Sequence, residues 1–169
     1  LIINTDLGQI LYYGRQYDLA IDQLRKTVEM DPTFIMAHYR LSEAYTQKGM
    51  HLEAIAEFNE ARKLSGTSPV FAGSLGYSYA VSGRRDQARK LINDWKELFA
   101  QGPRGVHHSY WIAAVYTALG ENDQALDWLE KSYDLHFGEL VLLPVEPRFD
   151  NLRSDRRFTS LLRRMNLPS

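Results

Sequence analysis

The residue types that most readily do chemistry are sparse in this chain of 169 residues. His107 and His108 are adjacent, and neighbouring side chains on a helix point about 100° apart, so the two rings cannot hold one metal ion together. His51 and Glu53 match half of a zinc-deaminase signature, but the chain contains no cysteine to complete it. The patterns of phosphate-binding loops, serine hydrolases and zinc proteases are also missing from the sequence. We therefore expect no catalytic residues, no metal and no cofactor, and a protein that is not an enzyme.

Composition and charge narrow the classes of partner. The chain is 44% hydrophobic and 24% charged, with a net charge of −1, so its overall charge does not favour nucleic acid or an anionic membrane as a partner of this segment. Its longest apolar run, at 140–145, is far shorter than the roughly 20 residues of a membrane-spanning helix. The absence of cysteine fits a reducing compartment, and we expect a cytoplasmic protein. Because the sequence begins with Leu1 inside an apolar pattern, we expect it to be a piece of a longer chain.

The elements that must position any binding residues form a repeat. Four segments align on Ala20, Ala54, Ala88 and Ala125, at spacings of 34, 34 and 37 residues. In each segment, apolar residues recur at helical intervals on both sides of a polar or glycine-containing turn, which predicts a pair of amphipathic helices. One such pair cannot bury both of its apolar stripes, whereas stacked pairs share a continuous core. The sequence therefore predicts an all-α repeat protein.

Two further columns of small residues have physical roles. Residues with small side chains allow helices to cross closely. We therefore expect one set of aligned residues in the first helices to face the aligned alanines of the second helices. This set is Gly8, Ser42, Gly76 and Ala113. A left-handed or tight backbone costs least for glycine, and we expect such a backbone at the turn inside each pair, where the sequence has Gly14, Gly49, Gly83 and Gly120.

The period and these columns resemble the tetratricopeptide repeat, a family of stacked antiparallel helix pairs that mostly act as protein-binding scaffolds. The family's Leu-Gly pair corresponds to Leu7-Gly8, its small and bulky second-helix residues to Ala20 and Leu24, and its terminal proline to Pro32. The resemblance implies a right-handed solenoid of four repeats plus a C-terminal capping helix. The units run over residues 1–34, 35–68, 69–105 and 106–139, and a tail covers 140–169.

The resemblance also implies a ligand surface. Members of the family bind ligands in a concave groove lined by residues of the first helix of each unit. The corresponding groove residues in this sequence are Thr5, Gln9, Tyr12, Tyr13, Met36, Tyr39, Glu43, Val70, Tyr77, His107 and Tyr110. Tyrosine combines apolar area with a hydroxyl group and little rotamer freedom, and it is enriched in recognition surfaces. The alternative to a place in the groove is that some of these rings pack between neighbouring helices or against the tail.

The groove residues constrain the ligand. Tetratricopeptide domains that hold the acidic C-termini of chaperones use lysine and asparagine at the fifth and ninth positions of their first unit, where this sequence has Thr5 and Gln9. Without that cation, a C-terminal carboxylate loses its main charge-assisted hydrogen bonds. We therefore expect a peptide or partner helix with apolar or aromatic anchors, laid along the groove.

The tail departs from the repeat. Pro144 and Pro147 interrupt any long helix, and we expect a short turn followed by a helix over about 155–165 with Ser154 as its N-cap. Its apolar stripe suits a cap on the array, and we interpret its arginines as the solvated face of that cap rather than an anion site. The tail resembles the closing segment of tetratricopeptide arrays in multidomain bacterial regulators that carry winged-helix or protein-kinase domains.

These observations predict a non-catalytic scaffold that binds a protein or peptide through a tyrosine-rich groove. The partner could also be another domain of the same chain, and the scaffold is expected to be a module of a larger regulatory protein. Two alternatives stay open: a regulatory module that responds to a small molecule, and an element that self-associates through the N-terminal stripe of Ile3, Leu7, Ile10 and Leu11.

Overall fold

The computed structural model describes residues 1–66, 72–102 and 106–168, and these residues form helices without any strand. The α-helices are α1 (Ile2–Tyr13), α2 (Tyr17–Met30), α3 (Ile35–Gln47), α4 (His51–Ser65), α5 (Ala72–Val81), α6 (Arg85–Ala100), α7 (Val106–Leu119), α8 (Asn122–Asp134) and α9 (Arg156–Arg164). Two 3₁₀ helices lie in the tail, η3 (Gly138–Leu142) and η4 (Pro147–Leu152). The predicted all-α fold class is confirmed.

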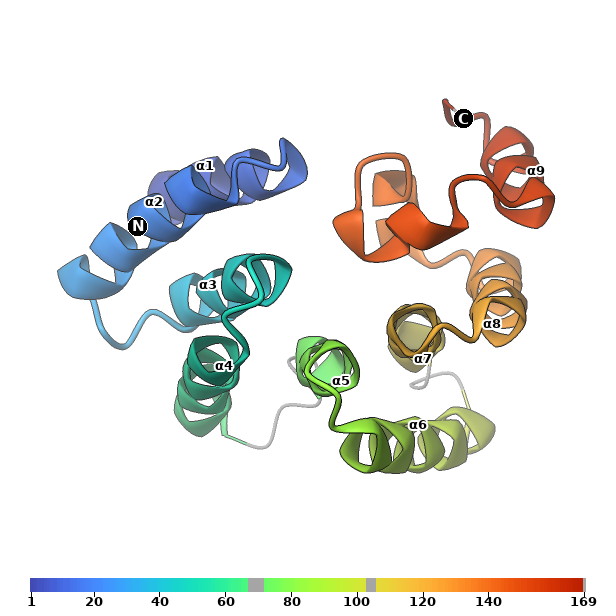
Figure 1. The fold of residues 1–169 in the computed structure, drawn as a ribbon, viewed down its shortest axis with the longest axis horizontal. Helices are drawn as coiled ribbons and strands as arrows, with labels where there is room; N and C mark the ends of the chain where they lie inside the picture. The colour runs from blue at the N-terminus through green and yellow to red at the C-terminus, as the bar shows by residue number, and fades with distance from the viewer. Residues whose placement is uncertain (67–71, 103–105, 169) are drawn as a thin grey trace. The chain divides into compact units, whose positions relative to one another are not determined.

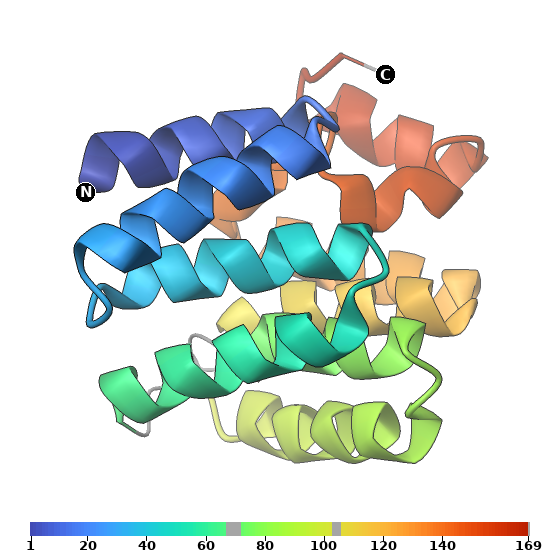
Figure 2. The ribbon, with the colours of Figure 1, turned by 60° about the vertical axis from the view of Figure 1, so that its left-hand side comes forward.

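The chain divides into two compact units, Leu1–Ser78 and Tyr79–Ser169. In the first unit, α1 pairs with α2, α3 pairs with α4, and α2 lies against α3 (Figures 1 and 2). In the second unit, α7 pairs with α8, η4 packs on α7, and α9 packs on α8 (Figure 1). Short turns join the helices of each pair, so the two helices run antiparallel.

The aligned columns of the sequence form the core. All four alanines of the alignment are 0% exposed: Ala20, Ala54, Ala88 and Ala125. The bulky residues four positions later are at most 2% exposed: Leu24, Phe58, Ile92 and Leu129. Small and large residues thus alternate along each second helix, which lets neighbouring helices approach and interdigitate.

Gly8 lies close to the partner helix α2. A Cβ added at Gly8 would lie 2.5 Å from Leu24 Cγ, and the next two nearest atoms also belong to Leu24. The nearest atoms of α2 to Gly8 thus belong to the bulky residue Leu24, one helical turn after Ala20. The absent side chain makes room for a branched leucine, which fills the crossing better than two small residues facing each other would.

The turns inside the pairs differ in the residue that is left-handed. Gly49, Gly83 and Gly120 have φ angles of 75°, 79° and 78°, as expected, but Gly14 has a φ of −74°. In the first pair the left-handed residue is Arg15, with a φ of 61°. Arg15 lies five residues before Ala20, the same interval that separates the other three glycines from their alanines. The register of the turn, rather than the nearest glycine, determines which residue becomes left-handed.

The tail contains the predicted short turn and final helix, with a different N-cap. The side chain that caps α9 is Asp155, whose carboxylate accepts a hydrogen bond from the backbone N–H of Arg157, so the expectation for Ser154 is wrong. Aspartate adds a negative charge at the positive end of the helix dipole, which serine cannot do. The apolar side chains of α9 itself are buried, namely Phe158, Leu161 and Leu162.

Two tail arginines bind the acidic face of α8. Arg157 contacts Asp127 and Glu130, and the guanidinium of Arg164 stacks 4.3 Å from the ring centre of Tyr133. These contacts dock α9 onto α8 and agree with a capping role for the helix.

We predict that Gly49→Ala lowers the free energy of unfolding by about 1 kcal/mol, because an L-residue is strained at positive φ. A Cβ at Gly49 would meet nothing within 4 Å, so the backbone alone causes the loss. The matched control is Gly14→Ala, at negative φ, which should leave stability unchanged or raise it by about 0.5 kcal/mol. Urea titrations of both variants measure the difference, and equal losses would contradict the assignment of the turns.

Candidate partner-binding surface

The predicted groove residues all belong to first helices of the helix pairs, apart from Val70, which lies outside the described residues. The helix α1 carries Thr5, Gln9, Tyr12 and Tyr13, α3 carries Met36, Tyr39 and Glu43, α5 carries Tyr77, and α7 carries His107 and Tyr110. The structure divides this set by accessibility. Five are buried, at 1% to 7% exposure: Thr5, Tyr12, Tyr39, Glu43 and Tyr110. The other five reach solvent at least in part: Gln9, Tyr13, Met36, Tyr77 and His107.

Tyr12 and Tyr39 are buried in the first unit. Tyr12 belongs to the core cluster that includes Ala20, Leu24 and Tyr45. Its ring makes edge-to-face contacts with Tyr13 and Tyr17 at centroid distances of 5.3 and 5.9 Å. Such contacts add packing energy beyond burial and fix the ring orientations.

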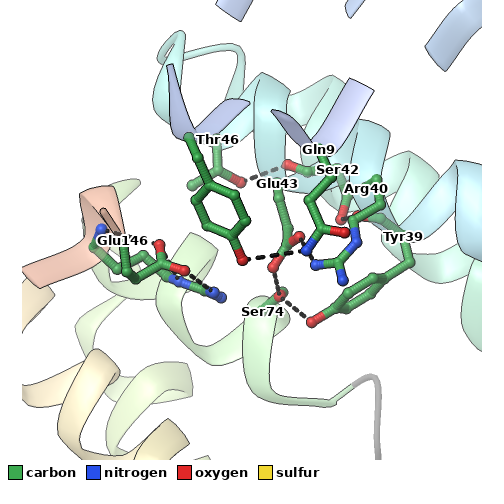
Figure 3. Close-up of polar contacts among 10 residues, drawn as sticks. Gln9, Tyr39, Arg40, Ser42, Glu43, Thr46, Ser74 and Glu146 are labelled. Carbon is green, nitrogen blue, oxygen red and sulfur yellow. Dashed lines mark hydrogen bonds and ion pairs between the residues drawn. The ribbon is translucent and has the colours of Figure 1, made fainter. Parts of the chain in front are cut away.

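A buried polar network joins α3 to α5 in the first unit (Figure 3). Arg40 donates a hydrogen bond of 2.8 Å from Nη1 to Glu43 Oε2, and Ser74 Oγ lies 3.1 Å from Glu43 Oε1. The same Ser74 hydroxyl lies 3.2 Å from the hydroxyl of Tyr39. The Glu43 side chain is 4% exposed, so these partners replace the water that its carboxylate has lost.

The charge of this network is balanced within α3. Burial lowers the pKa of the Arg40 guanidinium, but the attraction of Glu43 and the hydrogen bond to it outweigh burial and hold that pKa above its usual value. Arg40 therefore stays charged beside Glu43. The two residues are three positions apart on one helix, a spacing that brings side chains together. Arg40 was not among the predicted groove residues, although this spacing is visible in the sequence.

A second set of hydroxyl groups continues the junction between α3 and α5. Thr46 Oγ1 and Ser78 Oγ are 2.8 Å apart, and Ser78 also donates to the backbone carbonyl of Ser74 at 2.8 Å. Ser42 donates to the carbonyl of Tyr39 at 2.6 Å. Because these groups are buried and bonded, a sliding movement of α5 along α3 would break several hydrogen bonds together.

Other side chains of the first unit are at least partly exposed. Gln9 donates from Nε2 to the hydroxyl of Tyr13 at 3.2 Å, which holds both side chains on one face of α1 (Figure 3). Met36 is 36% exposed, and the Arg40 side chain is 20% exposed. Together with Tyr77, these residues combine apolar area with amide, hydroxyl and guanidinium groups. They make up what we call the unit 1 surface: Gln9, Tyr13, Met36, Arg40 and Tyr77.

In the second unit, Tyr110 anchors the tail to α7. Its ring centroid lies 5.4 Å from Trp111, 5.5 Å from Phe137 and 5.4 Å from Phe149. The alternative that some groove tyrosines pack against the tail therefore describes Tyr110. His107 remains exposed on α7, and its ring contacts Phe137 edge-on at 5.2 Å.

An ion pair lies buried in the same tail segment. Glu146 is 0% exposed and accepts two hydrogen bonds from the Arg148 guanidinium, at 2.9 and 2.7 Å. The guanidinium also lies 4.4 Å from the ring centre of Trp111 on α7. A buried charge is tolerated only when it is paired, so this pair favours one docked position of the tail on α7.

The described residues contain neither a metal-binding cluster nor a membrane-spanning helix. No group of three or more histidine, aspartate or glutamate side chains in residues 1–66, 72–102 and 106–168 is arranged to hold a metal ion. Within the same part of the chain, every helix is too short or too polar to cross a membrane.

Comparison with known proteins identifies the family. The pattern of the tetratricopeptide repeat matches residues 10–143, and this chain belongs to that family. It is also 24% identical to the TPR repeat-containing protein YpiA of Bacillus subtilis (strain 168), over 71% of this chain. The chain spans 36% of the length of that relative. Tetratricopeptide repeats generally mediate protein–protein interaction. Their fold is of the type that serves as a non-catalytic scaffold.

We predict that Glu43→Ala lowers the free energy of unfolding by about 2–4 kcal/mol, because it leaves the Arg40 charge buried without its partner. Glu60→Ala is the control, since Glu60 pairs with Lys63 at the same helical spacing on an exposed surface. That change should cost less than about 0.5 kcal/mol. Chemical denaturation of both variants tests the contrast, and similar small losses would mean that the network contributes little.

Proposed function

We propose that this chain is a non-catalytic interaction module whose unit 1 surface binds a peptide or partner helix. The observation that carries the proposal is that partly exposed residues suited to recognition occur in the same unit as a buried hydrogen-bonded network. Tyr13, Met36 and Tyr77 supply apolar and aromatic area, while the hydrogen bond between Ser74 and Glu43 links α5 to α3. A surface that is ordered before binding loses less conformational entropy when a partner docks.

The polar groups of the surface favour a ligand without a dominant negative charge. Thr5 is 4% exposed and donates to the carbonyl of Leu1, and Gln9 is bonded to Tyr13. The cation Arg40 is already neutralised by Glu43. A partner with apolar or aromatic anchors therefore fits this surface better than an acidic C-terminus, and the guanidinium donors that Glu43 does not use suit carbonyl groups of the ligand.

The wider setting of the module is part of the same proposal. The similarity of the tail to closing segments of bacterial regulators, together with the greater length of the Bacillus relative, supports a place in a larger regulatory protein of the cytoplasm. The partner is then another protein or another domain of the same chain.

Peptide selection tests this function directly. Peptides selected from a displayed random library on the wild-type chain should bind in solution, and the double variant Met36→Ala, Tyr77→Ala should weaken them at least tenfold in fluorescence anisotropy. Loss of two central anchors typically has an effect of this size. Leu52→Ala, which truncates a 72% exposed residue on the second helix α4, is the matched control. Equal binding by wild type and the double variant would reject the unit 1 surface as the site.

Self-association is a second candidate that one observation favours. Several large apolar side chains at the N-terminal end of the first unit are exposed, with Ile2 at 68%, Ile3 at 82%, Ile10 at 67% and Met30 at 64%. Asn4 Nδ2 lies 3.4 Å from Met30 Sδ, so α1 and the end of α2 contribute to one surface. Exposed apolar area of this kind marks interaction surfaces.

We predict that the wild-type chain shows a mass that rises with concentration in sedimentation equilibrium. Ile3→Glu with Ile10→Glu should keep it monomeric, because burying these charges in an apolar contact is costly. Leu52→Glu places the same charge on an exposed residue of α4 and should leave association unchanged. A constant monomer mass of the wild type would exclude this candidate while leaving peptide binding unaffected.

A further inference from the structure

Ser160 lies on the outer face of α9 in the second unit. Its side chain is exposed, whereas the apolar residues of the helix, Phe158, Leu161 and Leu162, are at most 3% exposed. At about 100° per residue, Ser160 points at least 100° away from each of these three side chains. Within residues 1–66, 72–102 and 106–168, its hydroxyl group has no hydrogen-bond partner. The hydroxyl group is therefore accessible from solvent.

Four arginines occupy every position that neighbours Ser160 along the helix. Residues three and four positions apart lie side by side on a helix, and for Ser160 these residues are Arg156, Arg157, Arg163 and Arg164. At about 100° per residue, Arg156 and Arg163 flank the serine on one side, and Arg157 and Arg164 flank it on the other. No acidic residue in the sequence of α9 offsets this charge.

The two pairs of arginines differ in their acidic partners. Arg157 and Arg164 form ion pairs with acidic residues of α8. Arg156 and Arg163 are exposed, and neither has an acidic partner in the part of the chain that the structure describes. A negative charge on Ser160 would therefore attract these two guanidinium groups without displacing the contacts between α9 and α8.

The neighbouring hydroxyl group, on Thr159, is held differently. Thr159 is only partly exposed, and its Oγ1 donates a hydrogen bond of 3.1 Å to the backbone carbonyl oxygen of Arg156. Asp155 precedes Thr159 by four positions, so a negative charge on Thr159 would lie near a carboxylate. Of the two hydroxyl groups in α9, the one on Ser160 is better placed to carry a negative charge.

We propose that Ser160 is a phosphorylation site and that Arg156 and Arg163 hold its phosphate on the outer face of α9. In the reaction, Ser160 Oγ attacks the γ-phosphorus of a nucleoside triphosphate, and the bond between that phosphorus and the bridging oxygen breaks. The nucleoside diphosphate leaves, and the hydroxyl proton passes to a base of the kinase. The phosphate carries a charge of about −1.5 to −2 at pH 7. The inference concerns the second unit and is independent of partner binding by the unit 1 surface.

The enzyme that fits is a separate protein kinase that selects arginine on the N-terminal side of its target, since Arg156 and Arg157 precede Ser160 by four and three positions. Such a kinase takes its substrate as extended chain, so α9 has to open first. The helix has nine residues and packs through one face, and elements of this kind open at lower free energy than a core. Once transferred, the phosphate favours the closed helix, because its ion pairs at these spacings form only in the helical state.

Treatment of the whole chain with an arginine-directed serine/threonine kinase, ATP and Mg²⁺ tests the modification. Mass spectrometry of the digested product should place the phosphate on Ser160. Ser160→Ala should abolish incorporation, whereas the control Thr159→Val should retain it. Phosphate on Thr159 or Ser154 instead, or no incorporation into the wild-type chain, would overturn the assignment of Ser160.

Amide hydrogen exchange tests the contacts of the phosphate, on a chain in which phosphoserine is incorporated at position 160 during synthesis. Exchange of the α9 amides should slow about fivefold, the size of effect expected of two exposed ion pairs on one helix. The α3 amides of the first unit serve as the internal control and should be unchanged. In the double variant Arg156→Gln, Arg163→Gln, the phosphate should no longer slow exchange. Equal exchange of α9 with and without phosphate in the wild-type background would contradict the role of the two arginines.

Discussion

The close crossing of the two helices in each pair is the constraint on which the rest of the structure depends. It requires a residue without a side chain, or with a very small one, opposite a branched residue, as Gly8 and Leu24 show in the first pair. Once the helices are this close, the apolar stripes of successive pairs merge into one core within each unit. The first helices then keep one face for other uses, because their packing needs are met by the opposite face.

The free face of the first helices is not simply solvated. In the first unit, a charge-balanced network of Arg40, Glu43 and Ser74 occupies the junction of α3 with α5. In the second unit, aromatic rings around Tyr110 and the buried pair of Glu146 and Arg148 hold the tail on α7. Buried polar groups contribute little net stability but are demanding in geometry, so they favour one arrangement of the helices over its neighbours. This geometric demand suits a scaffold whose role is to present side chains in fixed positions.

His38 adds a polar junction of another kind, because one buried ring contacts two other segments of the first unit. It ties α3 to α4 and to the carbonyl of Pro32, within a helix that also carries Met36 and Tyr39. The repeat pattern does not require a histidine there.

The sequence by itself determined the all-α class, the family and the buried columns, because helical periodicity and the alanine register are local and repeated signals. The sequence indicated a turn at Gly49. It did not show that Arg15, rather than Gly14, takes the left-handed conformation in the first pair, because this depends on the register of the turn. Only the tertiary structure decided which groove tyrosines are accessible. Tyr39 and Tyr110 occupy the fifth position of their units and Tyr77 the ninth, but the burial of Tyr39 and Tyr110 comes from partners on other helices and in the tail. Exposure of a side chain depends on segments distant in sequence, and no local pattern records them.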